Sequence, residues 1–185
     1  MTYNISFEDY VNEIELVAKQ FPYECDLYFL ITYLLRGCSW NNRYVIRNIS
    51  DGRKSLKVHS DLFMSVVEGE SEKELLGFPD LAIVPLEFDK NISAKKDVNA
   101  VVEIKTINNK LKVTNQLVCQ INTFSKVIYT NGLKWKFYCK TSDHQERMTP
   151  FEIELGTCEQ NWEITWNLNA RDKWCILLKT LEEFI

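Results

Sequence analysis

The chain of 185 residues is long enough to bury one sizeable hydrophobic core and short for two. Hydrophobic residues make up 45% of it and charged residues 26%, as in ordinary soluble globular proteins. No apolar run approaches the roughly 18 residues that cross a membrane, and the start MTYNISFEDY lacks the pattern of a signal peptide. We therefore expect one cytoplasmic domain over residues 1–185.

The net charge of −4 argues against a nucleic-acid partner until its distribution along the chain is considered. From Lys90 to Lys140 the chain has ten lysines against Asp97 and Glu103, so this window carries +8 and the remainder −12. A basic segment inside an acidic protein favours a local nucleic-acid interface. A solvated lysine-rich face explains the same pattern equally well.

The six cysteines are scattered and form no CxxC pair, and His59 and His144 are the only histidines. Zinc sites usually need close pairs of ligands, so we expect buried or half-buried reduced thiols instead of a zinc site. These thiols belong to Cys25, Cys38, Cys119, Cys139, Cys158 and Cys175.

Two helices are predicted at the N-terminus. Ser6 and Asp9 resemble a capping box, and apolar residues then recur at helical spacing until Pro22 ends the helix. A second, largely apolar helix is predicted from Tyr23 to Arg36, with Gly37 suited to its C-terminal end.

Strands are predicted in the middle of the chain. Residues 44–49 read as a strand closed by an Asp51-Gly52 turn, residues 53–67 are undecided, and residues 68–74 form an acidic loop. Two β-branched, apolar segments, 81–84 and 98–106, are predicted to be strands buried on both faces.

The second half alternates helix and strand. We expect an amphipathic helix over 112–124, a strand over 126–130, a tight turn at Asn131-Gly132 and a strand over 133–139. In that last strand Trp135 is expected to be buried beneath a solvated face that carries Lys134 and Lys136. Strands over 151–155 and 161–168 and a helix over 170–184 complete the chain.

Charged residues stand at the ends of the two central strands. Side chains at i and i+2 of a strand point to the same face, so Glu103 and Lys105 point together. Asp80 stands at the start of the preceding strand, and it would lie beside Glu103 if the two strands are antiparallel neighbours. Two converging carboxylates favour a bound Mg²⁺ or Mn²⁺. The alternative is a buried Glu103–Lys105 ion pair with Asp80 as a turn residue.

The segments GFPDLAIVP and AVVEIKT, taken together, resemble the motif of the PD-(D/E)XK nuclease superfamily. The following helix NQLVCQINTF and hairpin KVIYTNGLKWKFY resemble the N-terminal nuclease domain of type I restriction-enzyme motor subunits and related small phage-defence nucleases. The resemblance covers roughly residues 23–139. It implies an α/β fold with an αβββαβ core, a mixed central sheet flanked by helices, and a C-terminal strand-strand-helix addition.

The resemblance also implies roles for single residues. Asp80, Glu103, the carbonyl oxygen of Ile104 and Glu24 would bind Mg²⁺ or Mn²⁺, although Glu24 is equally explained as a first-turn glutamate of its helix, and Glu13 or Glu15 could take its place. Lys105 would orient or activate the attacking water, with a pKa depressed by burial and a nearby cation, and Gln116 would help to hold the site or the DNA backbone. Where some relatives carry Tyr on this helix, the chain has Cys119 and Gln120.

The expected activity is that of a metal-dependent endonuclease on DNA, with RNA as the alternative substrate, in restriction, phage defence or counter-defence. Four lysines are candidates for phosphate contacts: Lys95, Lys96, Lys110 and Lys112. The competing hypothesis is a binding module on the same fold, weakly active or inactive. It would dock on a nucleic acid or a nucleoprotein complex, as a homodimer or with a protein partner.

Overall fold

A computed structural model describes residues 5–20, 22–50, 60–67, 74–75, 77–140 and 150–185. Its helices are α1 (Phe7–Gln20), α2 (Glu24–Arg36), η1 (Ser39–Asn42), α3 (Ser60–Phe63), η3 (Lys95–Asp97), α4 (Asn115–Thr123) and α5 (Ala170–Phe184). Its strands are β1 (Tyr44–Asn48), β2 (Val66–Val67), β3 (Glu74–Leu75), β4 (Leu81–Pro85), β5 (Ala100–Ile104), β6 (Lys126–Thr130), β7 (Lys134–Cys139), β8 (Phe151–Glu154), β9 (Gly156–Cys158) and β10 (Ile164–Trp166).

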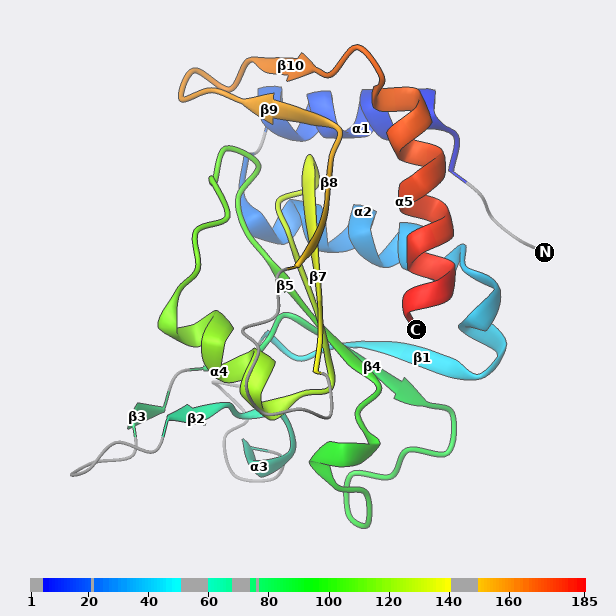
Figure 1. The fold of residues 1–185 in the computed structure, drawn as a ribbon, viewed down its shortest axis with the longest axis vertical. Helices are drawn as coiled ribbons and strands as arrows, with labels where there is room; N and C mark the ends of the chain where they lie inside the picture. The colour runs from blue at the N-terminus through cyan, green and yellow to red at the C-terminus, as the bar shows by residue number, and fades with distance from the viewer. Residues whose placement is uncertain (1–4, 21, 51–59, 68–73, 76, 141–149) are drawn as a thin grey trace.

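Six strands form one mixed sheet in the order β1-β4-β5-β6-β7-β8 (Figure 1). All neighbouring pairs are antiparallel except β5 and β6, which are parallel. A parallel pair needs a crossover connection, and α4 lies within it. The expected α/β fold with a mixed sheet flanked by helices is confirmed.

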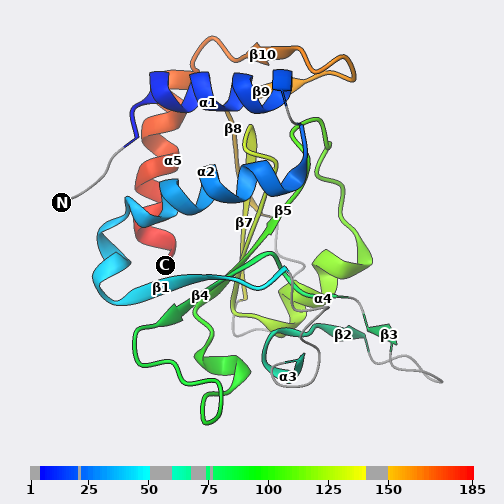
Figure 2. The same cartoon turned by 180° about the vertical axis from the view of Figure 1, so that it is seen from behind.

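The sheet is covered by different helices on its two faces (Figures 1 and 2). On one face α1, α2 and α5 pack in the larger core, which includes Tyr10 on α1, Leu27 on α2 and Leu177 on α5. On the other face α4 and α3 close a smaller core through Leu117 and Phe63. Strands β4 and β5 contribute to both cores because successive side chains alternate between the faces.

The two N-terminal helices follow the predicted pattern. The backbone N–H of Asp9 donates to Ser6 Oγ at 3.1 Å, and the Ser6 hydroxyl donates to Asp9 Oδ2 at 2.6 Å. The second helix ends at Arg36 as predicted, but Gly37 has a φ of −70° and is therefore not in the left-handed conformation. The chain instead continues into η1, which places Trp40 in the core.

The tight turn at Asn131-Gly132 is present between β6 and β7. Gly132 has a φ of +85°, and a Cβ there would lie 2.8 Å from Ile14 Cδ1, so both backbone and space favour glycine. The side chain of Asn131 accepts hydrogen bonds from the N–H groups of Leu133 and Lys134. Trp135 is fully buried, as predicted.

The C-terminal region departs from the prediction in its strands. Helix α5 spans the expected residues, but the strand expected over 161–168 is reduced to β10, and β9 pairs with it as a separate two-stranded sheet. Trp162 has a φ of +67°, which interrupts the extended run. A further small sheet of β2 and β3 occupies part of the segment left undecided and part of the expected acidic loop.

All six cysteines lie in the described part of the chain and are free thiols, but Cys25, Cys139 and Cys175 are exposed, whereas burial or partial burial was expected for all six. Among the described residues no helix is both long and apolar enough to cross a membrane. The expected Asp51-Gly52 turn, both histidines and most of the expected acidic loop lie outside the described residues.

Candidate metal and hydrolytic site

Strands β4 and β5 bring Asp80 and Glu103 to one end of the sheet. The strands are antiparallel, with Leu81 opposite Val102, and continuing this register by one residue places Asp80 opposite Glu103. The backbone N–H of Asp80 donates to the carbonyl oxygen of Val102 at 3.0 Å, which extends the pairing to that point. Directly opposite residues of antiparallel strands point to the same face. The carboxylates of Asp80 and Glu103 therefore lie side by side on one face at the same end of the sheet, as predicted.

Asp80 is held by donors from two different elements. Its side-chain oxygen Oδ1 accepts a hydrogen bond from the hydroxyl of Tyr28 on α2 at 2.5 Å. The other oxygen, Oδ2, accepts from the backbone N–H of Ile104 on β5 at 2.6 Å. Asp80 is only 6% exposed, so these two donors replace most of the solvation that it loses on burial.

Glu103 is surrounded by nitrogen donors. The ammonium of Lys105 donates to Oε1, and the amide of Gln116 donates to the same oxygen at 3.0 Å. The amide of Gln120 donates to Oε2 at 2.6 Å. Gln116 and Gln120 are four residues apart on α4, so both lie on the helix face that covers this end of the sheet.

Helix α2 approaches the same carboxylates from the other face of the sheet. Glu24 Oε2 lies 4.0 Å from Lys105 Nζ, and Glu24 Oε1 lies 3.2 Å from the Tyr28 hydroxyl. Glu24 and Tyr28 are one helical turn apart, and the turn that carries them faces the site. The structure thus brings together Glu24, Asp80, Glu103, Lys105 and Gln116, all of which the sequence had indicated.

The charges in this cluster do not balance. Three carboxylates, of Glu24, Asp80 and Glu103, face one ammonium, that of Lys105. Burial, followed by the nearby charge of Glu103, raises the pKa of Asp80 to about 7. Burial also raises the pKa of Glu103, while the charge of Lys105 acts in the opposite direction. An additional cation would relieve this repulsion.

The expectation of a depressed pKa for Lys105 is wrong in this arrangement. Burial disfavours the charged ammonium, but the hydrogen-bonded Glu103 outweighs it, and the pKa of Lys105 is raised. Sequence reasoning counted the desolvation and the expected metal but not the carboxylates that the fold places around the amine. Lys105 is therefore an ammonium that donates hydrogen bonds.

The donor set fits Mg²⁺ or Mn²⁺ as a pair of carboxylates completed by water. No group of three or more His, Cys, Asp and Glu side chains within the described residues is arranged to hold a metal by itself. Magnesium is commonly held by one or two carboxylates and several waters, so a pair such as Asp80 and Glu103 is compatible with this ion. Gln120 Oε1 is buried without a partner among the described residues, and this acceptor suits a water that donates to it. Ile104 contributes to the site through its backbone N–H, which donates to Asp80. The sequence had instead predicted that its carbonyl oxygen would bind the metal.

The four lysines proposed for phosphate contacts divide into two pairs. Lys110 and Lys112 are exposed on the connection between β5 and α4, which leaves β5 at the end that carries Glu103. Lys95 and Lys96 precede the start of β5, at the opposite end of that strand from Glu103, and Lys95 Nζ donates to the carbonyl oxygen of Met64. The structure therefore does not bring Lys95 and Lys96 to the carboxylates.

Sequence reasoning missed two residues of the site, Tyr28 and Gln120. Both stand four residues after a residue that was named, Glu24 and Gln116, and helical spacing puts such pairs on one face. That spacing was the available signal. Position 120 had been noted only as a departure from relatives that carry Tyr.

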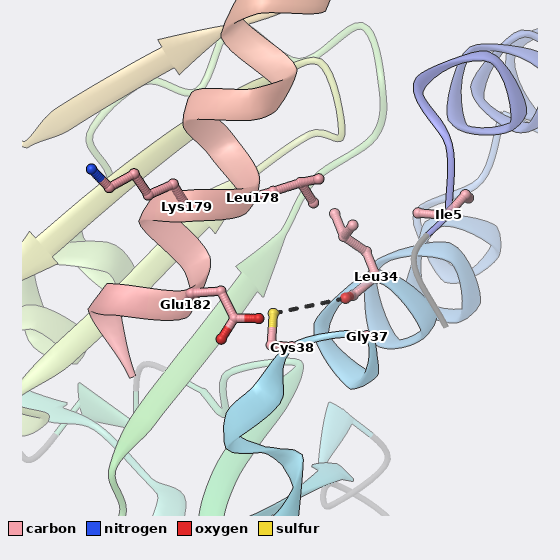
Figure 3. Close-up of a pocket in the computed structure, with 7 residues that line it drawn as sticks. All are labelled: Ile5, Leu34, Gly37, Cys38, Leu178, Lys179 and Glu182. Atoms are coloured by element: carbon pink, nitrogen blue, oxygen red, sulfur yellow. Dashed lines mark hydrogen bonds between the residues drawn. The ribbon is translucent and has the colours of Figure 1, made fainter. Parts of the chain in front are cut away.

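A pocket elsewhere on the molecule (Figure 3) is lined by none of these residues. It lies between the C-terminal end of α2 and α5 and is lined in part by Cys38 and Glu182. Burial raises the pKa of Cys38 to about 12, so its thiol stays protonated, and the thiol approaches the carbonyl oxygen of Leu34. Glu182 accepts hydrogen bonds from the N–H and hydroxyl of Ser39 at the start of η1, which is a structural role.

A scan against models of protein families, a search of curated proteins and a search of solved structures each found no match to this chain.

Proposed function

We propose that this protein is a metal-dependent phosphodiester hydrolase, an endonuclease that acts on DNA. The observation that carries the proposal is the convergence of buried Asp80 and Glu103 on adjacent strands, with Lys105 in contact with Glu103. The order α2-β1-β4-β5-α4-β6, with its single parallel pair, agrees with the αβββαβ core that the PD-(D/E)XK resemblance implies. A role in restriction, phage defence or counter-defence rests on that resemblance alone.

Each residue has a distinct task in this hydrolysis. Asp80 and Glu103 would hold Mg²⁺ or Mn²⁺, with Glu24 adding negative charge beside them. Such an ion would supply Lewis acidity toward the phosphate and would lower the pKa of a water. Gln116 and Gln120 keep Glu103 in one orientation. The ammonium of Lys105 orients the attacking water and stabilises the charge that develops on the phosphate oxygens.

Exposed Lys110 and Lys112 supply the phosphate contacts next to the site. They stand on the segment that leads from β5 to α4, and the hydroxyl of Tyr129 on β6 donates to the carbonyl oxygen of Lys112 at 3.2 Å. This hydrogen bond ties the lysine-bearing segment to the sheet. Substituting both lysines should weaken binding to all DNA sequences alike and reduce its salt dependence.

A nuclease assay tests the proposal. The wild-type protein is incubated with plasmid, single-stranded DNA and RNA in Mg²⁺, in Mn²⁺ and in EDTA, beside Lys105→Ala. Lys136→Ala is the matched control, because Lys136 is also a half-buried lysine paired with a glutamate on the same sheet. We expect cleavage of DNA that needs the metal, persists in Lys136→Ala and falls in Lys105→Ala by about 10²- to 10³-fold, the loss typical of removing one donor that stabilises charge in the transition state.

One feature favours a second candidate function, a binding module that does not cleave. Both oxygens of Glu103 already accept hydrogen bonds from Lys105, Gln116 and Gln120, so its carboxylate is compensated without a metal. Such a module would dock on a nucleic acid or a nucleoprotein complex. Absence of cleavage on every substrate, with DNA binding that is unchanged by EDTA, would support it and exclude the hydrolase.

A further inference from the structure

The hydroxyl of Tyr28 connects helix α2 to the acidic end of the sheet. It lies 2.5 Å from Asp80 Oδ1 and 3.2 Å from Glu24 Oε1. A phenol carries one proton and donates one strong hydrogen bond. The shorter distance indicates that the Tyr28 hydroxyl donates its hydrogen bond to Asp80 Oδ1. Glu24 Oε1 then receives no hydrogen bond from this hydroxyl.

The consequence for Asp80 is a fixed carboxylate plane. The terminal torsion of an aspartate is broad, so the group rotates readily unless both oxygens are held. Tyr28 holds Oδ1 from α2, and the Ile104 N–H holds Oδ2 from β5. Each oxygen retains a lone pair for a further partner, because a carboxylate accepts about four hydrogen bonds in total.

We infer that Tyr28 is a positioning residue, whose hydroxyl orients Asp80 so that its carboxylate can bind a divalent ion together with Glu103. The inference rests on the function proposed above and adds a residue from α2 to the site. Groups that hydrogen-bond to a metal ligand typically contribute about 10- to 100-fold to metal affinity. Without the Tyr28 hydroxyl, Asp80 Oδ1 loses its donor and the carboxylate turns about its remaining contact with Ile104.

The substitution Tyr28→Phe separates this role from packing. The ring of Tyr28 packs partly buried against the larger core, and phenylalanine keeps that ring while removing only the hydroxyl. The matched control is Tyr33→Phe. Tyr33 is on the same helix with 46% of its surface exposed, so the control removes a hydroxyl from α2 on its solvent side.

Calorimetric titration with Mn²⁺ at pH 7.5 measures the effect, with melting temperatures in EDTA recorded for all three proteins. We expect Tyr28→Phe to bind Mn²⁺ about 10- to 100-fold more weakly than wild type and Tyr33→Phe to bind as wild type. The melting temperature of Tyr28→Phe should fall by only a few degrees, the cost of one lost hydrogen bond, and that of Tyr33→Phe should stay at the wild-type value. If wild type cleaves DNA, excess Mn²⁺ should restore the cleavage rate of Tyr28→Phe to the wild-type rate.

The outcomes distinguish this inference from the proposed function. Wild-type affinity in Tyr28→Phe overturns the inference alone, as does an equal loss in Tyr33→Phe. A large fall in the melting temperature of Tyr28→Phe also overturns it, because the hydroxyl would then serve the fold. If wild type itself binds no Mn²⁺, the proposed function fails, and the inference fails with it.

Discussion

Two clusters of lysine and glutamate lie on the same face of the sheet, and they differ in charge balance and burial. Cross-strand partners connect them in one row: Glu103 lies opposite Tyr129, Tyr129 opposite Lys136, and Lys136 opposite Glu152. At the β7–β8 end, Lys134 and Lys136 pair with Glu152 and Glu154 at 2.8–3.2 Å.

The β7–β8 cluster is neutral as a whole, with two ammonium groups and two carboxylates. Its glutamates are more than a third exposed. Around Glu103, by contrast, three carboxylates share one ammonium, and Glu103 is 2% exposed. Both clusters come from similar sequence patterns, yet only the second lacks enough positive charge, and two of its three carboxylates, those of Asp80 and Glu103, are buried. This contrast indicates that a lysine–glutamate pair marks a site only when its surroundings leave charge uncompensated.

The largest expected difference between the clusters is in activity. Glu103→Gln removes half of the carboxylate pair, and we expect cleavage to fall at least about 100-fold, since metal-ion catalysis contributes several kcal/mol. Glu152→Gln is the matched substitution in the neutral cluster and should cleave at the wild-type rate. Single-turnover cleavage in Mg²⁺ measures both, and equal losses would mean that the charge imbalance has no catalytic role.

The contributions of the two clusters to folding stability should also change with pH in opposite directions. The folded-state pKa of Asp80 is raised to about 7, so the folded protein holds a proton that the unfolded chain releases near pH 4. Without metal, this group therefore lowers stability as pH rises between about 4 and 7. We expect Asp80→Asn in EDTA to raise the melting temperature at pH 8 and hardly change it at pH 5.

The free-energy gain at pH 8 should be at most about 4 kcal/mol, because each pKa unit corresponds to about 1.4 kcal/mol. Thermal unfolding of wild type and Asp80→Asn at both pH values checks it. A variant that is less stable than wild type at pH 8 would show that Asp80 is well compensated as it stands.

The smallest expected effect is the loss of unfolding free energy when an ion pair of the neutral β7–β8 cluster is removed. Burial works against ionisation of Glu152, but hydrogen bonds from Lys134 and Lys136 outweigh it, and the pKa of Glu152 is lowered. Its contribution is therefore present at neutral pH and lost as pH falls through the acid range. Glu152→Gln should cost less than about 1 kcal/mol at pH 7, because the pair is solvent-screened. Urea unfolding measures this cost, and a larger value would mean that the cluster is tightly coupled to the core.

The sequence predicted those parts of the fold that have long periodic patterns. Helices α1, α2 and α5 and strands β4–β7 occur close to their expected bounds, because continuous apolar periodicity reports burial directly. The strands β2, β3, β9 and β10 have only two or three residues each, too few for a period to be visible. The lysines flanking Trp135 were expected to be solvated, yet their ion pairs depend on glutamates of β8, which sequence patterns do not place.

In the candidate site, the residues that the sequence predicted to meet lie on paired strands, whereas Tyr28 and Gln120, which were missed, come from helices packed against the sheet. Asp80, Glu103 and Lys105 stand on consecutive strands, so pairing rules alone bring them together. Tyr28 contacts Asp80 across 52 residues and from the opposite face of the sheet. That contact depends on how α2 packs, and helix packing is not encoded in any local pattern.

The most direct test of the proposed metal site is a crystal structure of the protein soaked in Mn²⁺, with anomalous scattering used to locate the ion. We predict a peak between Asp80 and Glu103, at about 2.0–2.2 Å from oxygens of both carboxylates, with Lys105 moved off Glu103 Oε1. Saturating Mn²⁺ without a peak there, and with Lys105 still in contact with Glu103, would contradict it.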